Sequence, residues 1–128
     1  MKSLRFVGDS KVELIDVPEP TPTPDEVVID IQVSALCGSE MGVFRSPGGR
    51  AGNPGHEFAG QIVDTNGHTE FNVGDRVGAH VIVGCGTFRH CRAGNEIFCP
   101  NKLPSGYGHA ERIAVSARHC LRIPDGMD

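Results

Sequence analysis

The sequence predicts a mainly β, barrel-like domain with short helices and one long cysteine-containing loop. Its 128 residues include 17 glycines and 9 prolines, the residues that form turns between short strands. About seven short runs rich in β-branched and aromatic residues lie between these turns. No run is paired with a helix of the length that a βαβ unit needs, and no G-x-G-x-x-G or P-loop pattern occurs. These observations exclude a nucleotide-binding fold within these residues.

The first quarter of the chain predicts a hairpin followed by a connector. Residues 3–8 ("SLRFVG") and 11–17 ("KVELIDV") flank a turn at 8–10, as the two strands of a hairpin would. The next segment, "PEPTPTPDE" at 18–26, has a proline at every second position up to 24. Prolines lack an amide donor and favour extended backbone, so this segment predicts a connector and not a strand.

The clearest predicted strand is "EVVIDIQVSA", residues 26–35. Its side chains alternate with the period of two that is typical of a strand with one buried face. One side carries Val27, Ile29, Ile31 and Val33, and the other carries Val28, Asp30, Gln32 and Ser34.

The middle of the chain combines a short helix, a loop and a strand. Residues 36–44 ("LCGSEMGVF") have the length of one or two helical turns, for which Ser39 could act as the cap. The glycine- and proline-rich segment 46–55 predicts a loop. Residues 58–64 predict a strand that enters a turn, which places His56 at the mouth of that strand.

The last part of the chain predicts three further strands. Residues 74–83 form one candidate, and residues 84–108 form a long section with little periodicity that holds three cysteines and needs some internal tie. "AERIAVS" at 110–116 and "HCLRIP" at 119–124 predict two short strands. The final "DGMD", 125–128, is a turn sequence, so we expect the chain to be cut at a domain boundary.

Charge and composition exclude several partners. The net charge of −4 comes from 12 basic and 16 acidic residues without long runs, which argues against nucleic acid and anionic membranes as partners. No apolar run approaches the roughly 20 residues of a membrane span, and the N-terminus turns polar too early for a secretory signal. We therefore expect a cytoplasmic protein. Five cysteines, an odd number, suit metal or free thiols better than a disulfide framework.

Two short motifs offer metal ligands. "CGSE" at 37–40 and "GHE" at 55–57 supply a thiol, an imidazole, a hydroxyl and carboxylates, and zinc takes sulfur and nitrogen ligands in a tetrahedron. Cys37 and His56 are too far apart in the sequence for a local finger, so only the fold could unite them. Taken alone, Cys37 also suits a small buried hydrophobe, and His56 a surface or core histidine.

Five motifs in order carry a family resemblance. They are "CGSE" at 37–40, "NPGHEFAGQIVD" at 53–64, "FNVGDRVGAHVIVGCG" at 71–86, "HCRAGNEIFC" at 90–99 and "GYGHAERIAVSARHCLRIPDGMD" at 106–128. In order and spacing they resemble the N-terminal catalytic domain of the medium-chain, zinc-dependent alcohol and polyol dehydrogenases. The resemblance covers essentially the whole chain and implies a GroES-like, partly open β-barrel over residues 1–128, without the Rossmann domain that binds the cofactor.

The resemblance implies a role for each residue of the two short motifs. Cys37 and His56 correspond to catalytic zinc ligands, and Glu57 to a carboxylate near the metal that can enter its ligand shell. Ser39 corresponds to the hydroxyl that binds the substrate oxygen and begins a proton relay. Glu40 corresponds to an acidic residue that orients the ligands from behind.

The same resemblance implies what lies outside the chain. The remaining zinc ligand and the NAD(P)-binding domain follow residue 128 in the family, so we expect the fragment alone to be inactive. The expected substrate is a small secondary alcohol or polyol, and an oligomer is possible through the missing domain. The expected reaction is hydride transfer from the alcohol to nicotinamide, with the substrate oxygen polarised by zinc.

A cysteine lobe departs from the family pattern. Many members hold a structural zinc in C-x2-C-x2-C-x7-C, a closed four-thiolate site. Cys85, Cys91 and Cys99 match its first, third and fourth positions, but Phe88 occupies the second. Since phenylalanine cannot bind a metal, a closed site would need His90, water or a shifted residue. Otherwise the lobe holds free thiols, with Phe88 packed against its apolar side.

Two other functions remain open from the sequence. One is a GroES-like binding or scaffold module without metal, which would have lost catalysis. The other is a co-chaperonin subunit, which shares the fold but needs a ring interface. Cys120 matches no ligand position and is predicted to be a small core residue.

Overall fold

The computed structural model describes residues 1–48, 52–80, 82–102 and 106–127. Within these residues seven strands form two antiparallel sheets, a two-stranded hairpin and a five-stranded sheet of order β6-β3-β4-β5-β7. Strand bounds are β1 Lys2–Gly8, β2 Lys11–Asp16, β3 Glu26–Ala35, β4 Glu57–Asp64, β5 Arg76–Ala79, β6 Arg112–Ser116 and β7 Cys120–Arg122. The mainly β, partly open barrel that the sequence predicts is confirmed, as are the opening hairpin and the connector after it.

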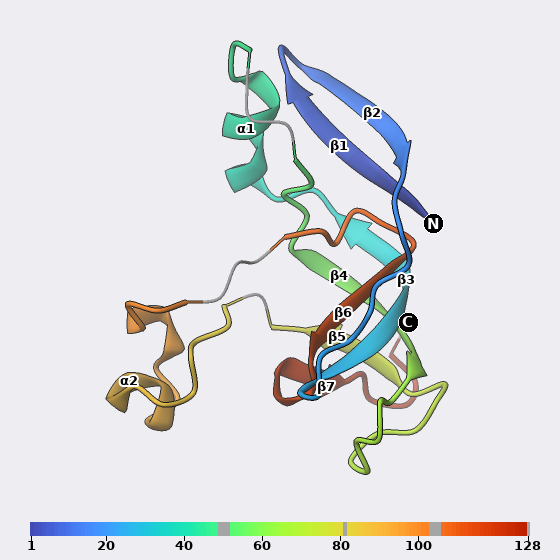
Figure 1. Ribbon diagram of the computed structural model, residues 1–128, viewed down its shortest axis with the longest axis vertical. Coiled ribbons are helices and arrows are strands. Elements are labelled where there is room, and N and C mark those ends of the chain that lie inside the picture. The colour runs from blue at the N-terminus through green and yellow to red at the C-terminus, as the bar shows by residue number, and fades with distance from the viewer. Residues whose placement is uncertain (49–51, 81, 103–105, 128) are drawn as a thin grey trace.

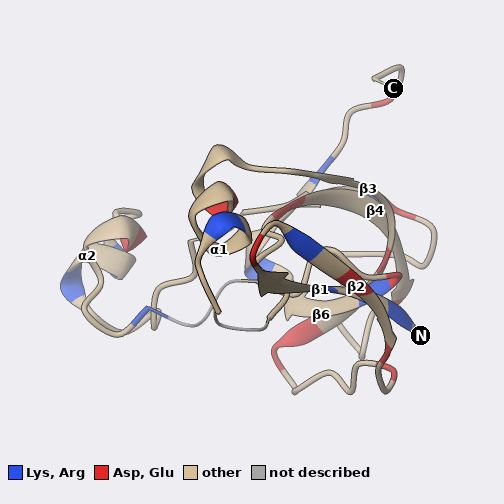
Figure 2. Cartoon of the chain, turned by 90° about the horizontal axis from the view of Figure 1, so that it is seen from above, with Lys and Arg blue, Asp and Glu red and all other residues tan. Residues whose placement is uncertain are grey.

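The helices are short and lie outside the sheet. They are η1 Gly38–Glu40, α1 Met41–Arg45, α2 Arg89–Arg92, η2 Glu96–Phe98 and η3 Ala117–His119. Figure 1 shows α1 beside the β1–β2 hairpin at one end, and α2 in a lobe that projects from the sheet. Lys and Arg are interspersed with Asp and Glu over the chain in Figure 2, without a large region of one sign. Among the described residues no helix is long and apolar enough to cross a bilayer.

The core lies on the inner face of the five-stranded sheet. Most of its members come from the three central strands and β6, where branched side chains pack against one another and are removed from water. The buried cluster is Val27, Ile29, Ile62, Phe71, Val77, Ile113, Ala117 and Cys120. The predicted core position of Cys120 is thus confirmed.

The predicted alternation along β3 is only partly correct. Val28, expected on the polar side, is 6% exposed, and Val33, expected on the apolar side, is 60% exposed. The pairing of β3 with β4 shifts register between Val28 and Ile29 and again between Ile31 and Val33. The second shift adds Gln32 to β3 and interrupts its period of two, so the apolar face does not continue along the whole strand. The first shift adds Val63 to β4 and leaves the alternation of β3 unchanged.

Two further local expectations differ from the structure. The strand predicted over 74–83 is β5, which begins at Arg76 and ends at Ala79, because its partner β7 extends only from Cys120 to Arg122; Val81 lies outside the described residues. Ser39 is not a helix cap, since it lies inside η1 and neither η1 nor α1 has a side-chain cap hydrogen bond. Its hydroxyl is used instead at the site described next.

Candidate metal centre

Strand pairing brings the two ligand motifs together. Cys37 follows the end of β3 and His56 precedes the start of β4. Because β3 and β4 are antiparallel, with Ala35 opposite Glu57, the end of one strand lies beside the start of the other. Ligand atoms of Cys37, His56 and Glu57 lie within 4.8 Å of one another. The fold thereby unites residues that are distant in the sequence.

Ser39 joins the thiol and the imidazole of this site. Its hydroxyl donates to Cys37 Sγ at 3.3 Å and lies 3.5 Å from His56 Nε2. Hydrogen bonds from Ser39, together with one to His56, hold the pKa of the Cys37 thiol below its usual value. A lowered pKa favours the thiolate, which is the form that binds metals.

The orientation of His56 leaves one ring nitrogen available. Nδ1 lies 2.9 Å from the carbonyl oxygen of Pro54, which can only accept, so Nδ1 carries a proton, and in the neutral ring Nε2 keeps its lone pair. The bond to the Pro54 carbonyl is also the main reason that the pKa of His56 is raised. A histidine fixed in this way presents Nε2 as a metal ligand.

A buried polar group lies behind His56. Glu40 is 2% exposed, and its Oε1 lies 3.2 Å from His56 Nδ1 without a hydrogen bond. Its Oε2 accepts a hydrogen bond from His109 Nε2 at 2.8 Å, and Ser34 Oγ lies 2.6 Å from His109 Nδ1. Because the carboxylate takes the proton of Nε2, Ser34 must donate to Nδ1. The position behind the ligands that the resemblance implies for Glu40 agrees with this geometry.

Sequence reasoning left His109 without a role, although it is the main partner of Glu40. Its ring also stacks on Phe6, with ring centroids 5.7 Å apart. The sequence did contain an indication that His109 belongs to the site, because "GYGHA" is part of the last motif of the family resemblance. No local pattern in that run shows that it returns to the site.

Asn53 ties the His56 loop to the His109 segment. Its carboxamide oxygen accepts from the backbone N–H of Gly55 at 3.0 Å and of His109 at 3.2 Å, and its nitrogen donates to the His109 carbonyl at 3.0 Å. Gly55 packs so closely that an added Cβ would lie 2.6 Å from the backbone nitrogen of His109. Only glycine allows this approach, which sets the position of His56.

His56 also lines a largely apolar cleft of about 390 Å³. Phe58, His80, Tyr107, Ile113 and His119 are among the residues that line it. An apolar cleft with a few polar groups at one side is typical of small-molecule sites. A molecule in this cleft would reach the side chain of His56.

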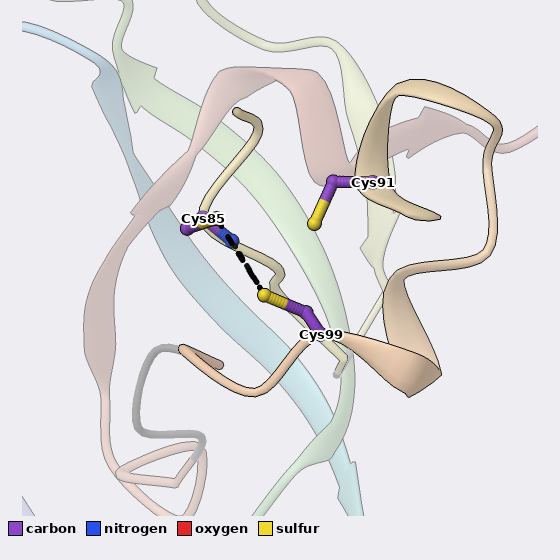
Figure 3. A group of neighbouring side chains, drawn as sticks. All are labelled: Cys85, Cys91 and Cys99. Atoms are coloured by element: carbon purple, nitrogen blue, oxygen red, sulfur yellow. Dashed lines mark hydrogen bonds between the residues drawn. The ribbon is translucent and has the colours of Figure 1, made fainter. Parts of the chain in front are cut away.

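The second cluster is formed by the three cysteines of the lobe. Ligand atoms of Cys85, Cys91 and Cys99 lie within 4.8 Å of one another, and all three thiols are free. Figure 3 shows the sulfurs of Cys91 and Cys99 directed into the same space beside Cys85. Hydrogen bonds from Thr87 and from backbone amides lower the pKa of Cys85 to about 6, whereas burial raises the pKa of Cys91.

The donor sets of the two clusters fit zinc differently. The first cluster has a thiol with a lowered pKa and an imidazole with a free Nε2, the sulfur and nitrogen donors that zinc prefers. The second cluster has three sulfurs, and no further histidine, cysteine or carboxylate among the described residues joins it. His90 does not complete it; its ring packs against Phe88 and Phe98. The closed four-ligand zinc site is therefore not formed by the described part of the lobe.

Comparison with known families and sequences agrees with the fold and the motifs. The family described as "Alcohol dehydrogenase GroES-like domain" matches residues 23–125. L-threonine 3-dehydrogenase from Shewanella sp. (strain W3-18-1) is 31% identical over 139 residues, covering 99% of this chain and 41% of that protein. The enzyme of the same name from Xanthomonas campestris pv. campestris (strain B100) is 34% identical over 140 residues, covering 98% and 40%. The chain thus spans less than half the length of these curated relatives.

Solved structures show the same architecture. Galactitol-1-phosphate dehydrogenase from Escherichia coli has a TM-score of 0.88 and 27% identity, covering all of this chain and 39% of its own. An alcohol dehydrogenase from Escherichia coli CFT073, solved with NADH, has a TM-score of 0.86 and 27% identity, with 100% and 40% covered. The similarity therefore extends over the entire fold.

Proposed function

Because the chain belongs to the alcohol dehydrogenase GroES-like domain family, we propose that it is the catalytic domain of a zinc- and NAD(P)-dependent dehydrogenase that oxidises a secondary alcohol or polyol. The observation that supports this most is the convergence of Cys37, His56 and Glu57, with the Ser39 hydroxyl within reach of both Cys37 and His56. The named relatives act on hydroxyl-bearing compounds, threonine and galactitol 1-phosphate among them.

The proposed chemistry assigns each side chain one task. Cys37 and His56 would hold zinc, with Glu57 available beside them, and bound zinc would supply Lewis-acid polarisation of the substrate oxygen. The Ser39 hydroxyl is placed to accept the proton of the substrate hydroxyl and pass it on. Glu40 holds His56 from behind, and the apolar side of the cleft excludes water from the substrate carbon.

The nicotinamide would be bound by residues outside this chain. Within the described residues the strands form antiparallel sheets only, whereas dinucleotide-binding domains use parallel βαβ units. The chain covers 41% of the length of a threonine dehydrogenase, which leaves ample sequence in such relatives for a cofactor domain. We assign hydride acceptance to that domain and propose residues 1–128 as the substrate-oxygen side of the site.

Metal binding by the purified chain tests the proposal. We expect Zn²⁺ to bind, and Cys37→Ala or His56→Ala to lower its affinity at the first cluster by at least about 100-fold, since even partners outside a ligand shell cost about 10- to 100-fold. Competition with a chromophoric chelator measures this affinity, and Co²⁺ substitution reports sulfur ligation through its visible spectrum. Cys120→Ala is the matched control, because it removes a buried thiol that lies in neither cluster.

The same experiment separates the enzyme from a metal-free scaffold. If Cys37→Ala and His56→Ala bind Zn²⁺ and Co²⁺ as the original chain does, the proposed catalytic site is wrong and the scaffold module becomes the better explanation. Joining the chain to the cofactor-binding part of the Shewanella relative tests the reaction. There, Ser39→Ala should lower kcat by about 10²- to 10⁴-fold without loss of zinc.

A further inference from the structure

The lobe of residues 82–102 brings three cysteine sulfurs together, whereas the family resemblance implies a site with four. Its three sulfurs come from a loop, from α2 and from the residue after η2, so the lobe must be folded for them to meet. Cys91 and Cys99 are buried, and the sulfurs of Cys85 and Cys99 lie 3.5 Å apart. Three sulfurs bound to one ion through bonds of about 2.3 Å would stand roughly 4 Å apart, close to this arrangement.

No fourth ligand is available among the described residues of the lobe. Its one carboxylate, Glu96, is occupied by the backbone N–H of Gly84, by Arg118 at 3.0 Å and by His119 at 2.9 Å. His90 packs tilted between two aromatic rings, 5.4 Å from Phe88 and 5.7 Å from Phe98 between ring centroids. The lobe therefore offers three thiolates with apolar rings nearby.

Close packing limits how far the cluster can rearrange to recruit another ligand. A Cβ added to Gly84 would lie 2.6 Å from Cys91 Sγ and 3.1 Å from the Glu96 side chain. The backbone N–H of Cys85 also points at Cys99 Sγ, at 3.5 Å.

The charge around the cluster favours a low-charge ion with thiolate ligands. Arg89 and Arg92 lie on either side of Cys91 in α2, and the Arg118 guanidinium donates to the Gly84 carbonyl at 2.5 Å. The Arg118 guanidinium also pairs with Glu96 at 3.0 Å, and positive charge beside Gly84 offsets part of the negative charge that three thiolates retain when the bound ion carries a single positive charge. Thiolates are soft ligands and select soft ions such as Cu(I).

From these observations we infer that the lobe is a three-thiolate site for Cu(I), formed by Cys85, Cys91 and Cys99. Structural zinc takes four ligands, and the described lobe supplies three. Cu(I) is a soft d¹⁰ ion that is stable with three thiolates, so it needs neither a fourth side chain nor a water. Binding of one Cu(I) displaces the protons that the thiols still carry at the working pH, and no electron is transferred. The site uses neither Cys37 nor His56 as a ligand.

Cu(I) titration of the reduced, full-length chain without oxygen tests this inference. The Cys37→Ala background removes the thiol of the other cluster, and a chromophoric Cu(I) chelator serves as the competitor. We expect one Cu(I) per chain, three sulfur neighbours by X-ray absorption, and a loss of affinity of at least about 100-fold in Cys85→Ser or Cys99→Ser. Cys120→Ala is the matched thiol control and should bind as the parent does.

Phe88→Cys provides the second arm, because it places a thiol at the one sequence position that lacks it. This variant should bind Zn²⁺ at least about 100-fold more tightly than the parent, with four sulfur neighbours. Equal zinc affinity in parent and variant would overturn the inference, as would unchanged Cu(I) affinity in both serine variants. Because the first cluster is disabled throughout, neither result bears on the proposed dehydrogenase.

Discussion

At the scale of single residues, His109 is the side chain on which the interior of the candidate site depends. It is the hydrogen-bond partner of Glu40, a buried residue with only 2% of its surface exposed. A buried charge without a partner is costly, because the protein interior solvates it poorly. His109 therefore stabilises the fold and holds Glu40 next to His56.

Replacing His109 by phenylalanine keeps the ring and removes its hydrogen bonds. We expect His109→Phe to lower the free energy of unfolding by about 3 to 5 kcal/mol, since Glu40 stays buried and loses its only hydrogen-bond donor among the described residues. Urea unfolding measures the loss, and the Glu40→Leu/His109→Phe double variant should lose less than the sum of the single changes. Strict additivity of the two losses would show that the pair does not interact.

Cys120 predicts a pH dependence at alkaline pH. Burial raises the pKa of this thiol from 9.0 to about 11, so the folded chain keeps its proton where the unfolded chain has lost it. The contribution of this thiol to the free energy of unfolding is fully present below pH 9 and is lost as pH rises through 11. The expected loss is about 2 kcal/mol, after allowance for partial solvent access. Unfolding of parent and Cys120→Ala at several pH values measures it. An equal slope above pH 9 in both would contradict the prediction.

At the scale of elements, the contact between β3 and β4 depends on Gly60. A Cβ at this position would lie 2.0 Å from the carbonyl oxygen of Asp30, a backbone atom that can move only with the strand. The close approach occurs beside the second register shift of the pair, between Ile31 and Val33, where strands bend and twist more strongly. Glycine is required there because any side chain would separate the strands.

Gly60→Ala should therefore destabilise the chain by about 1 to 3 kcal/mol or more, as overpacking of a core does. Gly42→Ala is the matched control, because a Cβ there meets no atom within 4 Å and the residue lies in α1, where alanine gains about 0.5 to 1 kcal/mol over glycine. Chemical denaturation of both variants gives the comparison. A Gly60→Ala variant as stable as the parent would show that β3 and β4 can separate without cost.

The same strands show which elements local sequence can predict. Turn residues and β-branched runs were sufficient to predict the existence and the chain order of all seven described strands, because both signals are local. The exposure of Val33 was not predictable, since it follows the extra residue Gln32 in the pairing of β3 with β4. The burial of Val28 was not predictable either, because it requires cover on the second face of β3 that local alternation does not show. The end of β5 at Ala79 likewise depends on the length of β7.

At the scale of the whole molecule, the candidate site was predictable where motif residues carry it and not where tertiary pairing does. The nearness of Cys37 and His56 agrees with the prediction from the family resemblance, and strand pairing supplies its physical reason. The connection from Glu40 to His109 and Ser34 was missed, because it joins segments up to 75 residues apart. The presence of Phe88 at a cysteine position was visible in the sequence, whereas the packing of the His90 ring against Phe88 and Phe98 required coordinates.

The position of Glu96 links the lobe to the cleft thermodynamically. This carboxylate receives the N–H of Gly84, the neighbour of Cys85, and also His119, which lines the cleft beside His56. Binding of Cu(I) in the lobe should therefore change the affinity of the cleft for its ligand. By thermodynamic reciprocity, the cleft ligand must change the affinity for Cu(I) by the same factor. Titrating a cleft ligand with and without Cu(I) measures that factor, and Glu96→Gln should reduce it towards one. A factor of one in the parent would mean that the two locations titrate independently.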